Sequence, residues 1–122
     1  MKQDRVKIHS KYGGCCAYCG KVIKIKEMQV DHVIPQWMDI PYRKGYGINV
    51  HDEDNLNPSC RRCNHYKRGD NLEQFRHKML TLHERAASHY IGKVAIDYGI
   101  ISLKPFDGKF YFEKYSHDTP TN

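Results

Sequence analysis

The chain has 122 residues, of which 39% are hydrophobic, and its formal net charge is +6. This length suits one domain with at most a small appendage, and the low apolar content favours a structural metal as an additional source of stability. The positive charge favours a polyanionic partner. No N-terminal apolar stretch resembles a secretion signal and no segment approaches transmembrane length, so we expect a cytoplasmic protein with no membrane partner.

The N-terminal part is predicted to contain a short helix, a strand and a long loop. Arg5 to Lys11 form the basic helix, which a glycine pair ends before the first cysteine pair. Residues 24–33 carry spaced apolar side chains and are predicted to form a strand that ends at Pro35. Residues 36–54 lack a periodic pattern, and a loop of this length in a small domain is usually functional or mobile.

The C-terminal half is predicted to be helical and then to form a hairpin. A short helix at Cys60 to Arg68 is followed by a longer one from Asp70 to Tyr98, with Asp70 and Glu73 as reciprocal caps. Apolar residues at helical spacing predict a core-facing seam along the longer helix: Leu72, Phe75, Met79, Leu82, Ala86 and Tyr90. Residues 100–115 are predicted to form a β-hairpin around an Asp107-Gly108 turn.

Four of the five cysteines fall into two pairs with zinc-ligand spacing. They are Cys16, Cys19, Cys60 and Cys63, and each pair can place two thiolates on one tetrahedral ion. Cys15 is an alternative to Cys16, but the two-residue gap before Cys19 favours Cys16. Four thiolates leave no place for water, so we expect a structural zinc. The alternatives are ordinary buried cysteines and a redox pair, and the absence of a βαβ pattern disfavours the latter.

A second cluster of polar residues lies between and after the cysteine pairs. Asp31 and His32 end the predicted strand, where neighbouring side chains face opposite sides. Asn64 follows the last cysteine, so a metal clamp would fix its position. Asp and Asn oxygens suit Mg²⁺ or Mn²⁺, and a neutral imidazole suits a general base. Taken singly, these residues have plain interpretations: a solvated loop pair for Asp31 and His32, a turn cap for Asn55, a helix cap for Asn64, and an exposed helix position for His65.

In combination these residues resemble a known family, the HNH endonucleases, whose active site is a ββα-metal unit. The motifs that carry the resemblance are Tyr12-Gly13-Gly14, Cys16 to Gly20, Val30 to Pro35, Asp54-Asn55-Leu56 and Cys60 to Lys67. The resemblance implies an α+β fold: a ββα core with its Cys₄ zinc clamp over residues 1–69. Residues 70–122 would then be a C-terminal extension, the long helix and hairpin, packed on that core.

The resemblance also implies roles for individual residues. His32 would be the general base that activates water, and Asp31 and Asn64 would be ligands of the catalytic cation. Asn55 would hold the loop that orients His32. Lys67 would approach a DNA phosphate or brace the helix. Family members often carry histidine where Asn64 stands, so Asn64 favours Mg²⁺ or Mn²⁺, with His65 as a further candidate ligand.

Basic residues near the motif and in the long loop are candidate DNA contacts: Arg43, Lys44, Arg61, Arg62, Lys67 and Arg68. Such contacts position DNA without reading its sequence. Trp37, Tyr42 and Tyr46 are candidates for stacking at a base step, although packing is the commoner use of such residues. No helix carries an obvious set of side chains for reading the major groove, so we expect a protein partner to supply specificity.

Two functions account for the cysteines and the charge. One is a metal-dependent DNA endonuclease, and the other is a non-catalytic zinc-ribbon module that binds nucleic acid or a protein. Only the endonuclease accounts for Asp31, His32, Asn55 and Asn64 together. An interaction role for the C-terminal helix and hairpin is compatible with either. The resemblance is compatible with phage packaging, mobile elements, restriction and host defence, and it sets no oligomeric state.

Overall fold

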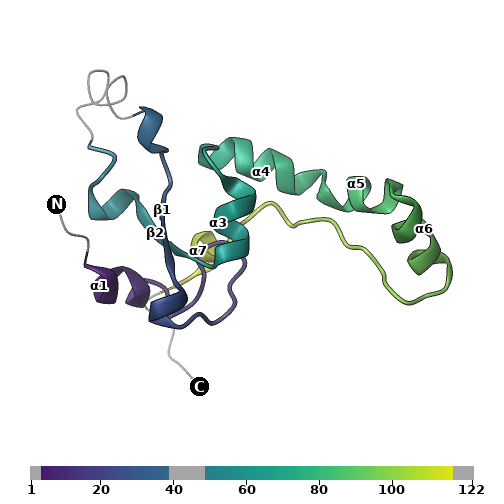
Figure 1. Cartoon of the computed structure of the whole chain (residues 1–122), viewed down its shortest axis with the longest axis horizontal. Helices are drawn as coiled ribbons and strands as arrows, with labels where there is room; N and C mark the ends of the chain where they lie inside the picture. The colour runs from purple at the N-terminus through teal and green to yellow at the C-terminus, as the bar shows by residue number, and fades with distance from the viewer. Residues whose placement is uncertain (1–3, 39–48, 117–122) are drawn as a thin grey trace. The chain divides into compact units, whose positions relative to one another are not determined.

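The computed structural model describes residues 4–38 and 49–116 (Figure 1). The chain divides into two compact units: Met1–Leu72 together with Phe110–Asn122, and Glu73–Lys109. These units differ from the predicted division into residues 1–69 and 70–122, because the residues from Phe110 onward group with the first unit. Within the described ranges, no helix is both long and apolar enough to cross a membrane.

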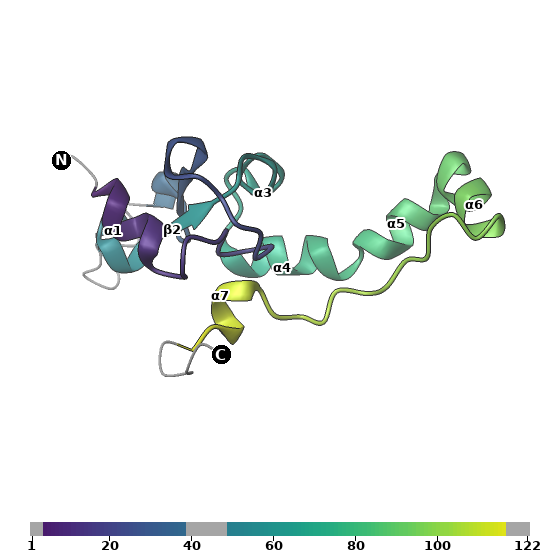
Figure 2. The same cartoon turned by 90° about the horizontal axis from the view of Figure 1, so that it is seen from below.

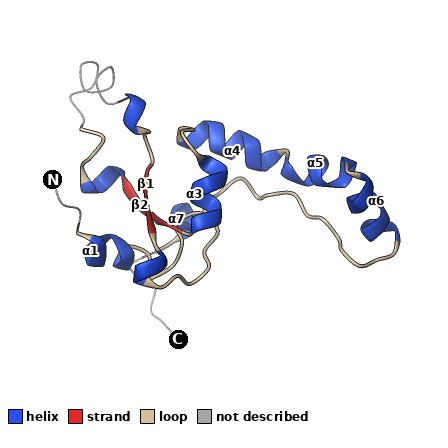
Figure 3. Cartoon of the chain, in the orientation of Figure 1, coloured by secondary structure: helices blue, strands red, loops and turns tan. Residues whose placement is uncertain are grey.

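The first unit is built on a two-stranded antiparallel sheet and the helix that follows it (Figure 3). Strand β1 (Gln29–His32) pairs with β2 (Leu56–Ser59), and α3 (Arg61–Lys67) begins two residues after β2 ends. The register sets Asp31 opposite Asn57 and His32 opposite Leu56. The predicted α+β fold with a ββα core is therefore confirmed.

Helix α1 (Arg5–Ser10) is the predicted basic helix, and it shapes the segment before β1. The guanidinium of Arg5 donates hydrogen bonds to the carbonyls of Ile25 (2.9 Å) and Met28 (2.8 Å). These bonds favour a turn, and residues Ile25–Glu27 form the 3₁₀ helix η1. The predicted strand over residues 24–33 is thus too long, because only Gln29–His32 pairs with another strand.

The second unit contains three short helices where one long helix was expected. They are α4 (Leu72–Leu80), α5 (Leu82–Ser88) and α6 (Tyr90–Asp97). The backbone of His89 is extended, with ψ of 142°. A Cβ on Gly92 would lie 2.3 Å from the carbonyl oxygen of Ala86, so glycine is required where α6 passes α5. The predicted apolar seam is broken: Phe75 is buried, whereas Tyr90 is 83% exposed.

The predicted C-terminal hairpin is wrong. Residues 101–110 have no regular structure apart from a bend, and the helix α7 (Tyr111–Lys114) follows. The backbone N–H groups of Tyr111 and Phe112 donate to the carbonyls of Tyr18 (3.2 Å) and Ala17 (2.8 Å). Phe110 is buried against the Tyr18 ring, with 5.4 Å between ring centroids. The start of α7, yellow in Figure 2, is therefore bonded to the first cysteine loop.

Gly20 is predicted to be indispensable for this contact. Its φ is +82°, and a Cβ there would lie 2.6 Å from Cδ1 of Tyr111. Gly13 also has a positive φ, but its Cβ would meet Tyr115 at an ordinary 3.4 Å. Both alanine variants should lose about 1–2 kcal/mol to left-handed backbone strain. Gly20→Ala should lose more in urea unfolding, because Tyr111 must also move. Equal losses for Gly20→Ala and Gly13→Ala would contradict this packing.

Candidate functional site

Four cysteine thiols meet where the first loop of the chain reaches the start of α3. The Sγ atoms of Cys16, Cys19, Cys60 and Cys63 all lie within 4.8 Å of one another. Cys60 is the N-cap of α3, and its sulfur accepts a hydrogen bond from the backbone N–H of Cys63 at 3.3 Å. Cys15 is not part of this group, so the structure brings together the four predicted cysteines and leaves out the fifth.

The chemistry of this cluster favours a thiolate-bound metal ion. A hydrogen bond from Cys63 lowers the pKa of the Cys16 thiol to about 4, with further backbone hydrogen bonds acting the same way against the effect of burial. Burial raises the pKa of the Cys19 thiol, and the hydrogen bond to Cys16 raises the pKa of the Cys63 thiol. Cys16 is thus the thiol most ready to be a thiolate, which is the form that binds metal. Four closely spaced sulfur donors suit zinc, which takes tetrahedral thiolate coordination, far better than a hard cation such as Mg²⁺.

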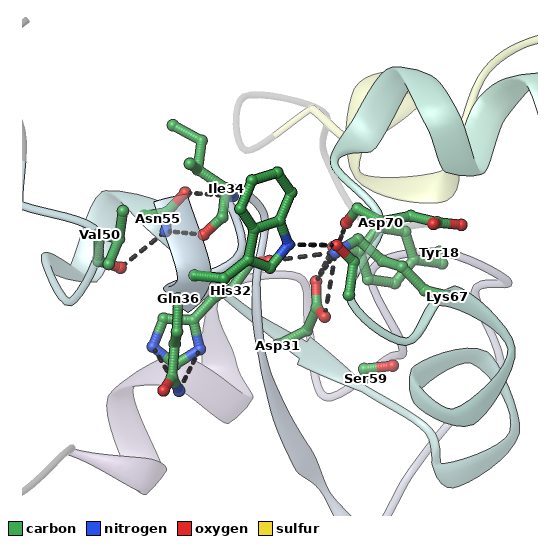
Figure 4. A network of polar contacts seen from close by, with 12 residues as sticks. Tyr18, Asp31, His32, Ile34, Gln36, Val50, Asn55, Ser59, Lys67 and Asp70 are labelled. Atoms are coloured by element: carbon green, nitrogen blue, oxygen red, sulfur yellow. Dashed lines mark hydrogen bonds and ion pairs between the residues drawn. The ribbon is translucent and has the colours of Figure 1, made fainter. Parts of the chain in front are cut away.

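Asp31 and Lys67 form a buried ion pair on the face of β1 that meets α3 (Figure 4). The Lys67 ammonium lies 3.3 Å from each carboxylate oxygen of Asp31. It also donates to the backbone carbonyls of His32 (3.1 Å) and Asp70 (2.8 Å). The hydroxyl of Tyr18 donates to Oδ2 of Asp31. Burial raises the pKa of the Asp31 carboxyl, and the charge of Lys67 opposes this shift.

The prediction that Lys67 contacts DNA is therefore wrong. Its side chain is 0% exposed, and the ammonium group already has acceptors on β1 and on the turn after α3. A lysine this deeply buried cannot reach a phosphate on the surface. The alternative that the sequence left open, in which Lys67 braces the helix, matches these contacts.

His32 projects from the opposite face of β1, as strand alternation requires. Its Nε2 lies 3.2 Å from Nδ1 of His51. The side-chain amide nitrogen of Gln36 lies 3.3 Å from Nδ1 of His32 (Figure 4). Burial lowers the pKa of the imidazole, and His51 and Lys67 lower it further. This shift favours the neutral form of the His32 imidazole. His51 and Gln36 were not singled out from the sequence, because no motif spacing connects them to His32.

Asn55 fixes the segment that follows β1. Its side-chain oxygen accepts from the N–H of Ile34 at 2.8 Å, and its amide nitrogen donates to the carbonyls of Ile34 (3.0 Å) and Val50 (2.7 Å). The backbone N–H of Val33 also donates to the Asn55 carbonyl at 2.9 Å. One buried amide thus holds both ends of the loop between residues 34 and 50.

Asn64 is half-buried and lies three residues before Lys67, on the same side of α3. Its side chain makes no hydrogen bond to any residue in the ranges that the structure covers, Asp31 included. His65 is exposed, with Nε2 3.5 Å from the Arg68 guanidinium.

The other candidate DNA contacts divide into two groups. Arg61, Arg62 and Arg68 are exposed on α3 or just after it. Arg43, Lys44, Tyr42 and Tyr46 lie outside the described residues. Trp37 is 66% exposed, and its indole N–H donates to the carbonyl of Gly69 at 2.9 Å.

Lys67→Met should destabilise the first unit by about 3–5 kcal/mol, because it leaves the Asp31 carboxylate buried without a counter-charge. Combining it with Asp31→Asn should recover part of the loss, since the unpaired charge is then removed as well. Urea unfolding of the three variants measures both effects. The control is Lys7→Met, which breaks an exposed pair with Glu53 (2.9 Å) and should change stability little. Similar losses for the Lys7 and Lys67 variants would disprove the role of the buried pair.

Comparison with known proteins gives an independent line of information. Residues 16–69 match the HNH endonuclease family. No significant match is found among curated protein sequences. Among solved structures, the Type II-C Cas9 enzyme from Actinomyces naeslundii is similar to this chain, with 27% sequence identity and a TM-score of 0.49. That similarity covers 61% of this chain but only 8% of the Cas9 chain. The family match covers the segment that holds both cysteine pairs together with Asp31, His32, Asn55 and Asn64.

Proposed function

We propose that the chain is a metal-dependent DNA endonuclease in which His32 is the general base and Asp31 and Asn64 bind one Mg²⁺ or Mn²⁺. One observation carries the proposal: within the segment that matches the family, an imidazole and a carboxyl group occupy adjacent positions at the end of β1. The lowered pKa of His32 supports its role as the base. DNA as the substrate is consistent with the net charge of +6.

In the proposed reaction, the neutral imidazole of His32 takes a proton from a water molecule. The oxygen of that water forms a bond to phosphorus, and the bond from phosphorus to the 3′ oxygen breaks. The 3′ oxygen leaves with the bonding electron pair and takes a proton from solvent. Asn55 keeps the backbone after β1 in place, and Gln36 and His51 hold the His32 ring in one orientation. Movement of the segment after β1 would misplace the His32 imidazole and lower the cleavage rate.

The side-chain oxygens of Asn64 and Asp31 suit a hard cation, but Asp31 is already paired with Lys67. The Asn64 amide has no hydrogen-bond partner among the residues described, and its oxygen is a suitable ligand. Asp31 is 4% exposed and already paired with Lys67, so a cation that binds there must share the carboxylate with an ammonium group. When bound, such a cation supplies stabilisation for the charge on the phosphate and on the leaving oxygen.

The pairing of Asp31 with Lys67 also favours a second candidate function. A carboxylate whose charge is already neutralised attracts a divalent cation weakly, so the domain would be a zinc module that binds nucleic acid without cutting it. Incubation of supercoiled plasmid with the purified chain and Mg²⁺ or Mn²⁺ distinguishes the two functions. Nicked or linear product supports the endonuclease, and intact plasmid with every divalent metal supports the binding module.

His32→Ala should keep the fold and DNA binding but lose about 10² to 10⁴ in cleavage rate, because it removes the proton acceptor. Asn64→Ala should also cut slowly, but excess Mn²⁺ should partly restore it by mass action on a weakened cation site. Plasmid cleavage across a Mn²⁺ titration gives both results. His77→Ala, which changes an exposed histidine in the second unit, is the matched control. Wild-type cleavage by the His32 variant, or its full rescue by Mn²⁺, would contradict these roles.

The zinc clamp should contribute folding energy. Each chain should bind one zinc ion through the four clustered thiols, and such sites contribute on the order of 10 kcal/mol in small zinc domains. Cys60→Ser should therefore unfold the first unit, whereas Cys15→Ser should have a mild effect. Metal analysis and circular dichroism measure zinc content and folding. Zinc-free protein that remains folded would contradict a structural role for the clamp.

A further inference from the structure

A groove of about 1060 Å³ lies between the segment that follows the first cysteine pair and the start of α3. One wall comes from residues 21–29 and the other from residues 60–65. Cys60 is part of the lining, so the cysteine clamp holds the two walls together. This volume is at the upper end of small-molecule pockets, which favours a segment of a polymer as the occupant.

Four cationic side chains line the groove: Lys21, Lys26, Arg61 and Arg62. All four are exposed, and Glu27 is the single carboxylate among the lining residues. None of the four has a side-chain hydrogen bond or an ion pair with any residue that the structure describes. Two other cations of the described residues do have carboxylate partners: Lys7 pairs with Glu53 and Arg76 with Glu73. Unneutralised cations gathered along one groove attract a polyanion.

The rest of the lining suits a sugar–phosphate chain. Val22 is 81% exposed and gives an apolar surface for sugars, while Gln29 and Asn64 offer amide groups. Asn64 also belongs to the proposed cation site, so the groove and that site share this residue. Lys21 and Lys26 were not recognised from the sequence, because they lie near the first cysteine pair and far in the chain from Arg61.

We propose that this groove binds the phosphodiester backbone of a nucleic acid, with Lys21, Lys26, Arg61 and Arg62 contacting phosphates. The proposal deepens the proposed function and rests on it for the substrate class. Contacts of this kind fix the position of the strand and carry no sequence information. The groove therefore fixes the position of the strand relative to α3. These four side chains do not contact the edges of the bases.

The test measures binding separately from cleavage. The zinc-loaded His32→Ala chain is titrated into labelled duplex DNA at several salt concentrations, and log affinity is plotted against log salt. Each phosphate contact contributes about 0.9 to the slope on duplex DNA and about 0.7 on a single strand. Lys21→Gln with Lys26→Gln should therefore flatten the duplex slope by about 1.8. Single-stranded DNA and RNA of the same length identify the form of nucleic acid that the groove prefers.

The matched control is Lys24→Gln, which removes an exposed lysine from the same segment but not from the groove lining. It should leave the slope unchanged. An unchanged slope for the double variant, or an equal effect of Lys24→Gln, would overturn the proposal. Polyglutamate that competes as well as nucleic acid would also overturn it, because the groove would then bind any polyanion. A flattened slope in a chain whose wild type never cuts would support the groove and reject the endonuclease.

Discussion

The buried ammonium of Lys67 is the contact on which the rest of the first unit depends. It joins the Asp31 carboxylate, the carbonyl of His32 and the turn after α3 at Asp70. A buried charge is tolerated only when it is paired and hydrogen-bonded, so all of these acceptors must be in place at once. This requirement fixes the position of α3 along β1, and it ties the backbone of His32 to the helix.

The cysteine cluster and Lys67 hold the two ends of helix α3. A helix of seven residues is too short to be stable alone, so its position depends on tertiary contacts. Cys60 and Cys63 anchor its first turn, and Lys67 anchors its last. Asn64 lies between these anchors, where its orientation relative to the sheet is set from both sides. This arrangement gives a domain with a sparse apolar core a rigid helix next to the candidate site.

The charges of the domain have two separate uses. Lys67 is internal and neutralises a carboxylate, whereas the groove cations, Lys21, Lys26, Arg61 and Arg62, form no ion pair with the described residues. The internal lysine sets structure, and the groove cations are free to meet a ligand. The net charge of +6 does not distinguish these uses, because it counts buried and exposed cations alike.

The sequence by itself determined the features that depend on local spacing: helix α1, the two cysteine pairs, and the strand that carries Asp31 and His32. Tertiary structure decided the features that depend on contacts between distant residues. The N–H groups of Tyr111 and Phe112 bond to the carbonyls of Tyr18 and Ala17, where a hairpin had been expected. Lys67 is buried although its neighbours in the sequence are typical of an exposed helix. His51 contacts His32 although the two are distant in the sequence. Burial and long-range pairing arise only after the chain has folded, and no local pattern records them.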